Sequence, residues 1–208
     1  MLNVVRLLAG PYEENAYLAW PEHGSEALLV DPGGNADMLM NEIEKRGLTL
    51  THILLTHGHF DHILAVPELR KRTDAKIWIH EMDESMLFDP YPLKLPFDYR
   101  HQFKGIRLND DDKVSGRELN LFGMRIEMIE TPGHTPGGVC YYLPDEGIMF
   151  TGDTLFADGY GRTDFATGRA ADMRASLAML FEMPNDIMIF PGHEESAKMG
   201  EAKRRIRI

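Results

Sequence analysis

The sequence predicts one α+β domain in which two β-sheets pack against each other between layers of helices. The length of 208 residues suits a single domain, expected to span residues 1–208. An apolar content of 43% is sufficient for a sizeable core. Short apolar runs alternate with helical stretches, and each half of the chain places strands before a helix and a further strand. This order favours two sheets covered by helices.

In the first half, an amphipathic segment over residues 35–47 predicts a helix. It begins at Asn35, a residue type that caps helix N-termini, and ends at Gly47. A shorter helix is expected over Pro67–Arg72, because proline is tolerated in a first turn. Residues 51–57 form an apolar run that ends in polar residues, as in a buried strand leading into a loop. Further strands are expected at residues 4–8, 16–20, 27–31 and 75–80.

The second half begins with an irregular segment. Residues 85–105 are rich in proline and aromatic residues, so we expect a long loop with a short helix, either a lid or a surface Ω-loop packed by its own side chains. Residues 116–131 predict a hairpin with its turn near Gly123. The basic stretch Lys198–Arg207 is expected to be a solvated end. Further strands are expected at residues 137–144, 147–153 and 186–193, and a helix at residues 171–183.

Charge and cysteine content exclude several classes of protein. A formal charge of −11 repels phosphate backbones, so no nucleic-acid partner is expected. The single cysteine, Cys140, excludes an intrachain disulfide and a cysteine-based zinc cage, and we expect it to pack in the core. No signal peptide or membrane-spanning run is present in the sequence. We therefore expect a cytoplasmic protein without a membrane partner.

The strongest functional signal is the segment HGHFDH at residues 57–62, directly after an apolar run. In extended backbone, His57 and His59 point to the same side, so both can bind one ion. Asp61 and His62 lie beyond them and point elsewhere, and a second ion is the simplest use for that pair. The segment therefore predicts a metal site.

Three later residues fall at the ends of expected strands, each beside glycine or proline: His134, Asp153 and His193. Catalytic groups commonly lie on such loops. A carboxylate has two oxygens that can bridge two ions, which makes Asp153 the natural bridge. Nitrogen and oxygen donors suit zinc, iron or manganese. The remaining histidines are expected to be ordinary core or surface residues, namely His23, His52, His80 and His101.

At these residues the chain resembles the metallo-β-lactamase superfamily, whose signature is H-x-H-x-D-H followed by a single His, Asp and His. The likeness runs from VDPGG near Asp31 to PGH at His193. It implies an αββα four-layer sandwich of two mixed β-sheets flanked by helices, with the site at one edge of the sheets. Asp31 would orient a ligand imidazole. The implied ligands are His57, His59 and His134 for one ion, Asp61, His62 and His193 for the other, and Asp153 for both.

Within the superfamily, the chain is most similar to hydroxyacylglutathione hydrolases (glyoxalase II) and their short relatives, at residues 131–142 and 150–165. Full-length glyoxalase II continues into a helical domain that helps to bind glutathione. This chain stops soon after His193, so no C-terminal helical glutathione-binding domain is expected. The best-known β-lactamases carry cysteine at the position of Asp153, and lactam hydrolysis is therefore not expected.

The resemblance implies a hydrolase with two divalent ions, zinc or alternatively iron or manganese. A hydroxide bridging ions about 3.5–4 Å apart would attack a small-molecule thioester or ester, with Asp61 and Asp153 as catalytic residues. A thiolate leaving group, with a thiol pKa of about 8.5, needs no strong general acid, which favours a thioester such as a hydroxyacylglutathione.

Arg162 is the candidate for substrate binding, since it lies in a glycine-rich loop after Asp153 and a guanidinium suits a carboxylate. The alternative is a structural arginine paired with Asp164 or Asp158.

Two other functions remain open. The GRTDF segment is similar to persulfide dioxygenases, which use a single iron that would be bound here by His57, His134 and Asp153. The third hypothesis is a non-catalytic metal-binding or redox module.

Overall fold

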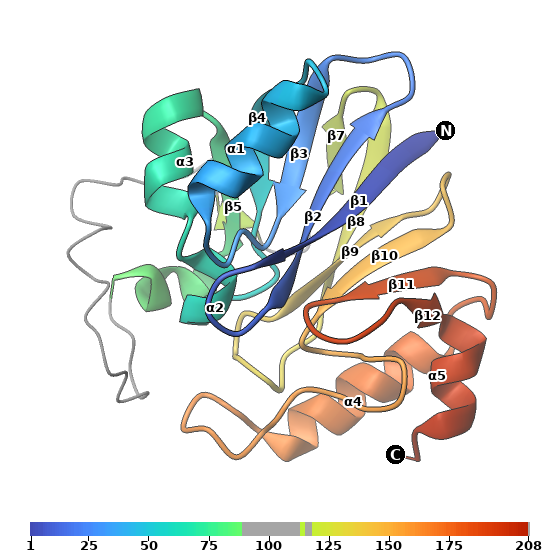
Figure 1. The fold of residues 1–208 in the computed structure, drawn as a ribbon. Coiled ribbons are helices and arrows are strands. Elements are labelled where there is room, and N and C mark those ends of the chain that lie inside the picture. Colours follow the sequence, from blue (N-terminus) through green and yellow to red (C-terminus); the bar gives the residue numbers. More distant parts are fainter. Residues whose placement is uncertain (89–112, 115–117, 208) are drawn as a thin grey trace.

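Two six-stranded β-sheets lie face to face in the computed structural model, with helices on both outer faces (Figure 1). The structure describes residues 1–88, 113–114 and 118–207. The strand order is β1-β2-β3-β4-β5-β6 in the first sheet and β12-β11-β10-β9-β8-β7 in the second. Both sheets contain parallel and antiparallel pairs. The predicted αββα sandwich of two mixed sheets is confirmed.

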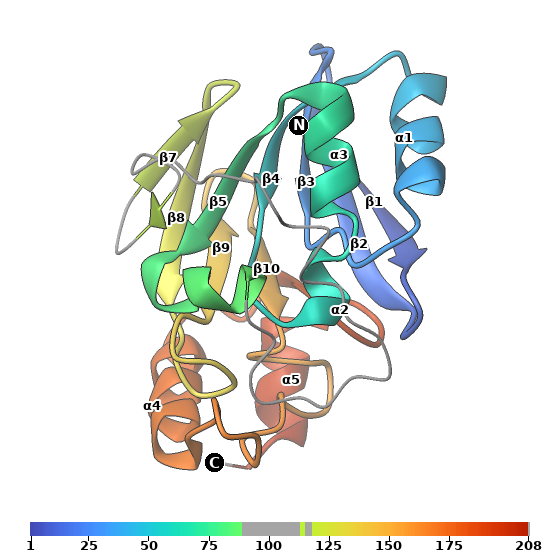
Figure 2. The same ribbon diagram turned by 90° about the vertical axis from the view of Figure 1, so that its left-hand side faces the viewer.

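The first sheet combines an antiparallel meander with a parallel part. Strands β1, β2 and β3 pair antiparallel, and β4, β5 and β6 follow in parallel. Parallel neighbours need crossover connections, and helices α1 and α3 provide them on the outer face of this sheet (Figure 2). The elements are β1 (Leu2–Ala9), β2 (Glu14–Pro21), β3 (Glu26–Val30), α1 (Ala36–Lys45), β4 (Thr49–Leu54), α2 (Phe60–Ile63), α3 (Val66–Thr73), β5 (Lys76–His80), the 3-10 helix η1 (Glu81–Leu87) and β6 (Lys113–Val114).

The second sheet is antiparallel except for one pair. The hairpin of β7 and β8 turns at Phe122 and Gly123, as predicted, and both residues have positive φ. Helix α4 connects β10 to β11, which pair in parallel. The elements are β7 (Glu118–Leu121), β8 (Met124–Glu130), β9 (Val139–Leu143), β10 (Ile148–Gly152), α4 (Ala170–Phe181), β11 (Met188–Pro191), β12 (Ala197–Lys198) and α5 (Met199–Arg205).

Apolar side chains fill three layers, one between the sheets and one beneath each set of helices. In β3, Leu28 and Val30 belong to the layer between the sheets, whereas Leu29 belongs to the layer under α1 and α3. Both faces of the strand are therefore buried. This explains why its sequence is a continuous apolar run rather than an alternating one. Cys140 is fully buried in the layer beneath α4 and α5, as expected.

The end of the chain departs from the prediction. Lys198–Arg207 is predicted to be a solvated end after a final strand, but it contains the end of β12 and the whole of helix α5. Met199 and Ala202 are fully buried against the second sheet and α4, and Ile206 is 7% exposed. These residues recur at the three-to-four-residue spacing of one helix face. The basic run Lys203–Arg205, between Ala202 and Ile206, concealed this stripe.

Two local predictions also change. Asn35 does occupy the N-cap of α1, but its backbone is left-handed, with φ of 54°, and its side chain makes no capping hydrogen bond. Of the irregular segment at residues 85–105, the structure describes only residues 85–88, where η1 ends, so the loop and its role as a lid lie outside the described residues. Among the helices that are described, none is long and apolar enough to cross a membrane.

The buried face of α5 yields a stability prediction. Met199→Ala should lower the free energy of unfolding by about 2–5 kcal/mol, because it leaves a cavity under the helix. The control Arg204→Ala changes an exposed side chain of the same helix and should stay within about 0.5 kcal/mol of the parent. Urea denaturation of chelator-treated protein measures both. Equal, near-zero effects would restore the solvated-tail interpretation.

Candidate metal centre

The seven predicted metal ligands lie on strand-end loops from both sheets. His57 and His59 follow β4, and Asp61 and His62 lie on α2 in the first half. His134, Asp153 and His193 follow β8, β10 and β11 of the second sheet. The structure gathers six of them into two groups, His57 with His59 and His134, and Asp61 with His62 and His193, and the ligand atoms within each group lie within 4.8 Å of one another.

His57 is oriented through a chain of hydrogen bonds. The Thr56 hydroxyl donates to Asp31 Oδ2 at 2.6 Å and lies 3.0 Å from His57 Nδ1. Because a hydroxyl has one proton, the His57 Nδ1–H must donate to Thr56. His57 Nε2 then carries a free lone pair, and it is buried without a hydrogen-bond partner. This nitrogen is available to a cation.

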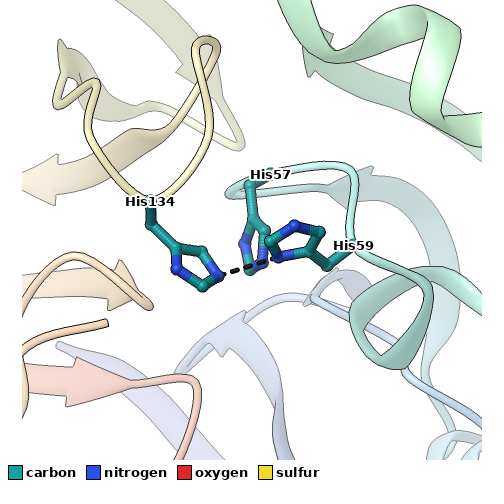
Figure 3. Close-up of side chains that lie close together, drawn as sticks. All are labelled: His57, His59 and His134. Atoms are coloured by element: carbon teal, nitrogen blue, oxygen red, sulfur yellow. Dashed lines mark hydrogen bonds between the residues drawn. The ribbon is translucent and has the colours of Figure 1, made fainter. Parts of the chain in front are cut away.

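The other two histidines of this group face each other. His134 Nδ1 donates to the Arg162 carbonyl at 2.7 Å, which leaves its Nε2 as an acceptor. That Nε2 lies 2.8 Å from His59 Nδ1 (Figure 3). The Thr167 hydroxyl lies 3.5 Å from the outer nitrogen of His59. Three imidazoles thus direct inner nitrogens into one volume and outer nitrogens toward the protein, the arrangement typical of metal-binding histidines.

Asp153 lies between the two groups. Its Oδ1 is 3.5 Å from His62 Nε2, and its Oδ2 is 3.4 Å from His134 Nε2 and 3.8 Å from His193 Nε2. On the more exposed side, His193 Nε2 lies 3.6 Å from Asp61 Oδ2. One carboxylate therefore contacts members of both groups, as the predicted bridge requires.

The two groups differ in their affinity for protons. Burial, aided by neighbouring histidines, lowers the pKa of His57 well below its usual value and that of His59 to about 3. Burial also acts to lower the pKa of His62, but Asp153, Asp31 and Asp61 together raise it well above its usual value. The pKa of His193 is likewise raised against the effect of burial, chiefly by Asp61. The second group therefore has a higher affinity for protons than the first, and a metal ion would compete with those protons.

The residues of this edge fit metal coordination. Within the part of the chain that the structure describes, His57 Nε2, His62 Nε2 and Asp153 Oδ1 are buried and have no hydrogen-bond partner. Each unsatisfied buried group of this kind costs about 1–3 kcal/mol, a cost that coordination would remove. The donors are imidazole nitrogens and carboxylate oxygens, which suit zinc, iron or manganese.

Sequence comparison identifies the family. The model of the metallo-beta-lactamase superfamily matches residues 9–193. The chain belongs to this superfamily. The match includes all seven predicted metal ligands. The resemblance to the metallo-β-lactamase superfamily that the sequence indicated is therefore confirmed.

Two relatives from the superfamily cover almost the whole chain. The probable metallo-hydrolase YqgX of Bacillus subtilis (strain 168) is 34% identical over 193 residues, which are 90% of this chain and 88% of that protein. The hydroxyacylglutathione hydrolase GloC of Haemophilus influenzae is 32% identical over 207 residues, 98% of this chain and 96% of that protein. The chain is thus a metallo-hydrolase relative, similar to glyoxalase II-like proteins.

Solved structures of the superfamily share the fold. The B3 metallo-β-lactamase BLEG-1 has a TM-score of 0.84 and 30% identity, covering 97% of this chain and 95% of that chain. TTHA1623, solved in a di-iron-bound form, has a TM-score of 0.81 and 30% identity, covering 97% and 98%.

Asp31 lies where an orienting group is needed. Its Oδ2 is 3.1 Å from His62 Nδ1, the nitrogen that faces away from Asp153, and its Oδ1 accepts from the Thr56 N–H at 2.7 Å. Although Asp31 lies close enough to His57 and His62 to share an ion with them, both of its oxygens already accept hydrogen bonds. We therefore interpret Asp31 as orienting His62 directly and His57 through Thr56.

Sequence reasoning missed several orienting groups. Thr56 directly precedes His57, so a hydroxyl beside a ligand was an available signal. Thr167 and the Arg162 carbonyl gave none, because only the tertiary structure brings them to an imidazole. Of the histidines set aside, His52 stacks on Trp78 and His80 caps η1 by accepting from the Met82 N–H. His101 lies outside the described residues.

Arg162 lies at the rim of the centre. Its side chain is 65% exposed and makes two hydrogen bonds to Asp164, at 2.9 and 2.7 Å. Its guanidinium carbon lies 4.4 Å from the centre of the Phe165 ring, and that ring is 5.7 Å from the ring of His59. The pairing with Asp164 matches the structural alternative, and the exposed guanidinium is also accessible to a substrate.

The raised pKa values of the second group predict that its metal binding competes with protons. A histidine must be neutral to bind a metal, so loading His62 releases a proton. Because the pKa of His62 is raised, the affinity for the second ion should fall as the pH drops, by up to about tenfold per pH unit for one displaced proton. Isothermal titration of Zn²⁺ in buffers of different ionisation enthalpy measures the release. His62→Gln should reduce the release, since His193 still contributes, and equal release from this variant would contradict the assignment.

Proposed function

We propose that the chain is a dinuclear metal-dependent hydrolase that cleaves a small-molecule thioester of the hydroxyacylglutathione type, or an ester. The observation that carries the proposal is Asp153, whose two oxygens face ligand groups that share no other residue. A site for one ion would not require both groups. The first ion would be held by His57, His59 and His134, and the second by Asp61, His62 and His193.

Divalent ions held by these residues would lower the pKa of a bound water from 15.7 toward about 7 and would polarise the substrate carbonyl. The chain itself then needs no side-chain nucleophile. Its one thiol, that of Cys140, is fully buried, and burial raises its pKa to about 12. Asp61 and Asp153 are the carboxylates at the reacting atoms. His193 and other neighbours keep the pKa of Asp61 below its usual value despite burial, so this carboxylate stays an acceptor.

The relatives support the substrate and the number of ions. GloC is named a hydroxyacylglutathione hydrolase and aligns with 98% of this chain. The di-iron form of TTHA1623 supports two ions in a chain of this fold and 30% identity. Zinc is the metal we propose, with iron or manganese as alternatives, because the donors are nitrogen and oxygen. We also propose a cytoplasmic location, consistent with the single buried thiol.

Metal analysis followed by a substrate panel tests the proposal. Protein purified without added metal should contain about two ions per chain by mass spectrometry, as a dinuclear centre requires. It should hydrolyse a hydroxyacylglutathione or a simple thioester faster than an oxygen ester, a β-lactam or a phosphodiester. Asp153→Ala should lose both ions and all activity, since it removes the contact common to both groups.

Three results would contradict this proposal. One iron per chain with oxygen uptake on a persulfide would indicate the dioxygenase. No turnover of any substrate by protein loaded with two ions would favour a non-catalytic module. Full metal occupancy in Asp153→Ala would remove the bridging role.

Arg162 is proposed to bind a carboxylate of the substrate. Arg162→Ala should then raise KM more than it lowers kcat, because the contact lies away from the reacting atoms. The matched variant Asp164→Asn removes the competing carboxylate and should lower KM. Steady-state kinetics on the best substrate of the panel measures both. If the pair is structural, the two variants will change KM in the same direction.

A further inference from the structure

Each ligand group takes members from both sheets. In the first group, His57 and His59 follow β4 of the first sheet and His134 follows β8 of the second. In the second group, Asp61 and His62 lie on α2 and His193 follows β11 of the second sheet. Coordination tolerates errors of only about 0.2 Å, so the loops of the two sheets must be fixed relative to each other.

A buried carboxylate joins the loops of the first group. Asp83 of η1 is fully buried; its Oδ2 accepts from the Gly58 N–H at 3.0 Å and its Oδ1 from the Gly137 N–H at 2.7 Å. Gly58 lies between His57 and His59, and Gly137 lies in the loop of His134. A Cβ on Gly58 would lie 2.9 Å from the Asp83 carbonyl oxygen, and one on Gly137 would lie 2.7 Å from Oδ1. The two loops therefore meet on this carboxylate in close contact.

A buried side-chain amide joins the loop of His193, in the second group, to the first sheet. Asn15 of β2 is 1% exposed, and its Nδ2 donates to the carbonyls of Pro191 at 2.9 Å and Glu194 at 2.8 Å. Its main-chain N–H donates to the Gly192 carbonyl at 2.7 Å. Three hydrogen bonds from one residue of the first sheet thus surround His193. Glu194 has φ of 69°, an uncommon conformation without glycine, and this contact helps to hold it.

We propose that Asp83 and Asn15 are positioning residues, Asp83 for the ion bound by His57, His59 and His134, and Asn15 for the ion bound through His193. The proposal rests on the proposed dinuclear centre but not on the identity of its substrate. The two residues have complementary chemistry, since a carboxylate offers two acceptors to two N–H groups and an amide nitrogen offers two donors to two carbonyls. Neither tolerates its isostere. Asp83→Asn sets an amide N–H against a main-chain N–H, and Asn15→Asp sets an oxygen against carbonyl oxygens.

Single-site backgrounds separate the two effects. In full-length protein, His193→Ala retains the complete first group, and His134→Ala retains the complete second group. The probe is Zn²⁺ alone, titrated into chelator-stripped protein in competition with a chromophoric chelator. Asp83→Asn should weaken Zn²⁺ binding about 10–100-fold in the His193→Ala background, and Asn15→Asp should do the same in the His134→Ala background. Asp83→Asn in the His134→Ala background, and Asn15→Asp in the His193→Ala background, should each change the Zn²⁺ dissociation constant less than about threefold.

A purely structural role predicts a different pattern. General loosening of the domain would weaken Zn²⁺ binding equally in both backgrounds, and that result, or no effect in either, would overturn the proposal. Ile43→Ala is the matched control, because it creates a cavity beside α1, which carries no ligand, and should lower Tm without changing either dissociation constant.

If Asp83→Asn or Asn15→Asp does not fold, milder variants can be used instead. Tyr17→Phe removes a 2.7 Å hydrogen bond to the Pro191 carbonyl and should weaken only the second group, and Asp83→Glu should weaken only the first. Failure of the enzymatic proposal is distinguishable, because no substrate enters these titrations. If His134→Ala binds no Zn²⁺ at all, the dinuclear centre fails while the Asp83 prediction remains measurable in His193→Ala.

Discussion

The centre depends on the contact between the two sheets, because neither sheet carries a complete ligand group. Tyr17 illustrates how this contact is made. Its ring packs between the sheets against Phe150 and Phe190, with centroids 5.4 and 5.3 Å away, and its hydroxyl donates to the Pro191 carbonyl beside His193. Tyr141 repeats the arrangement from the second sheet, donating to the Leu55 carbonyl. Apolar packing sets the separation of the sheets, and the polar tips of the same side chains fix their loops.

Without a bound cation, the edge of the sheets that carries the seven ligands raises the free energy of the folded state. Buried imidazoles and carboxylates crowd together there, and His57 Nε2 and Asp153 Oδ1 lack hydrogen-bond partners. The apolar layers on either side offset this cost, since proteins accept local conflict at functional sites when the rest of the fold is consistent. Ions that bind only the folded chain would add to its stability by mass action. Folding and metal binding are thus coupled through the same few residues.

The sequence predicted those parts of the metal centre whose residues lie together in short segments of the chain. His57, His59, Asp61 and His62 lie together in the chain, and apolar runs mark the strands that precede every ligand. Asn15 was not predicted, because its hydrogen-bond partner is 176 residues away and is a main-chain carbonyl, which has no signature in the sequence. Asp83 and the Arg162 carbonyl were missed for the same reason. Helix α5 was missed for another reason, since the basic run Lys203–Arg205 stands between the buried Ala202 and Ile206 and gives the segment the composition of a solvated tail.

The division between the buried ligands and the exposed rim is also relevant to how relatives of one fold differ in activity. A β-lactamase structure and a hydroxyacylglutathione hydrolase have similar identity to this chain, 30% and 32%. One fold can host different activities, so differences between such relatives lie in the groups at the site and around it. Here the buried ligands are held by loops of both sheets. Arg162 is 65% exposed, and among the described residues its side chain donates hydrogen bonds to Asp164 alone. Substrate preference can therefore change at the rim without disturbing the geometry that Asp83 and Asn15 maintain beneath it.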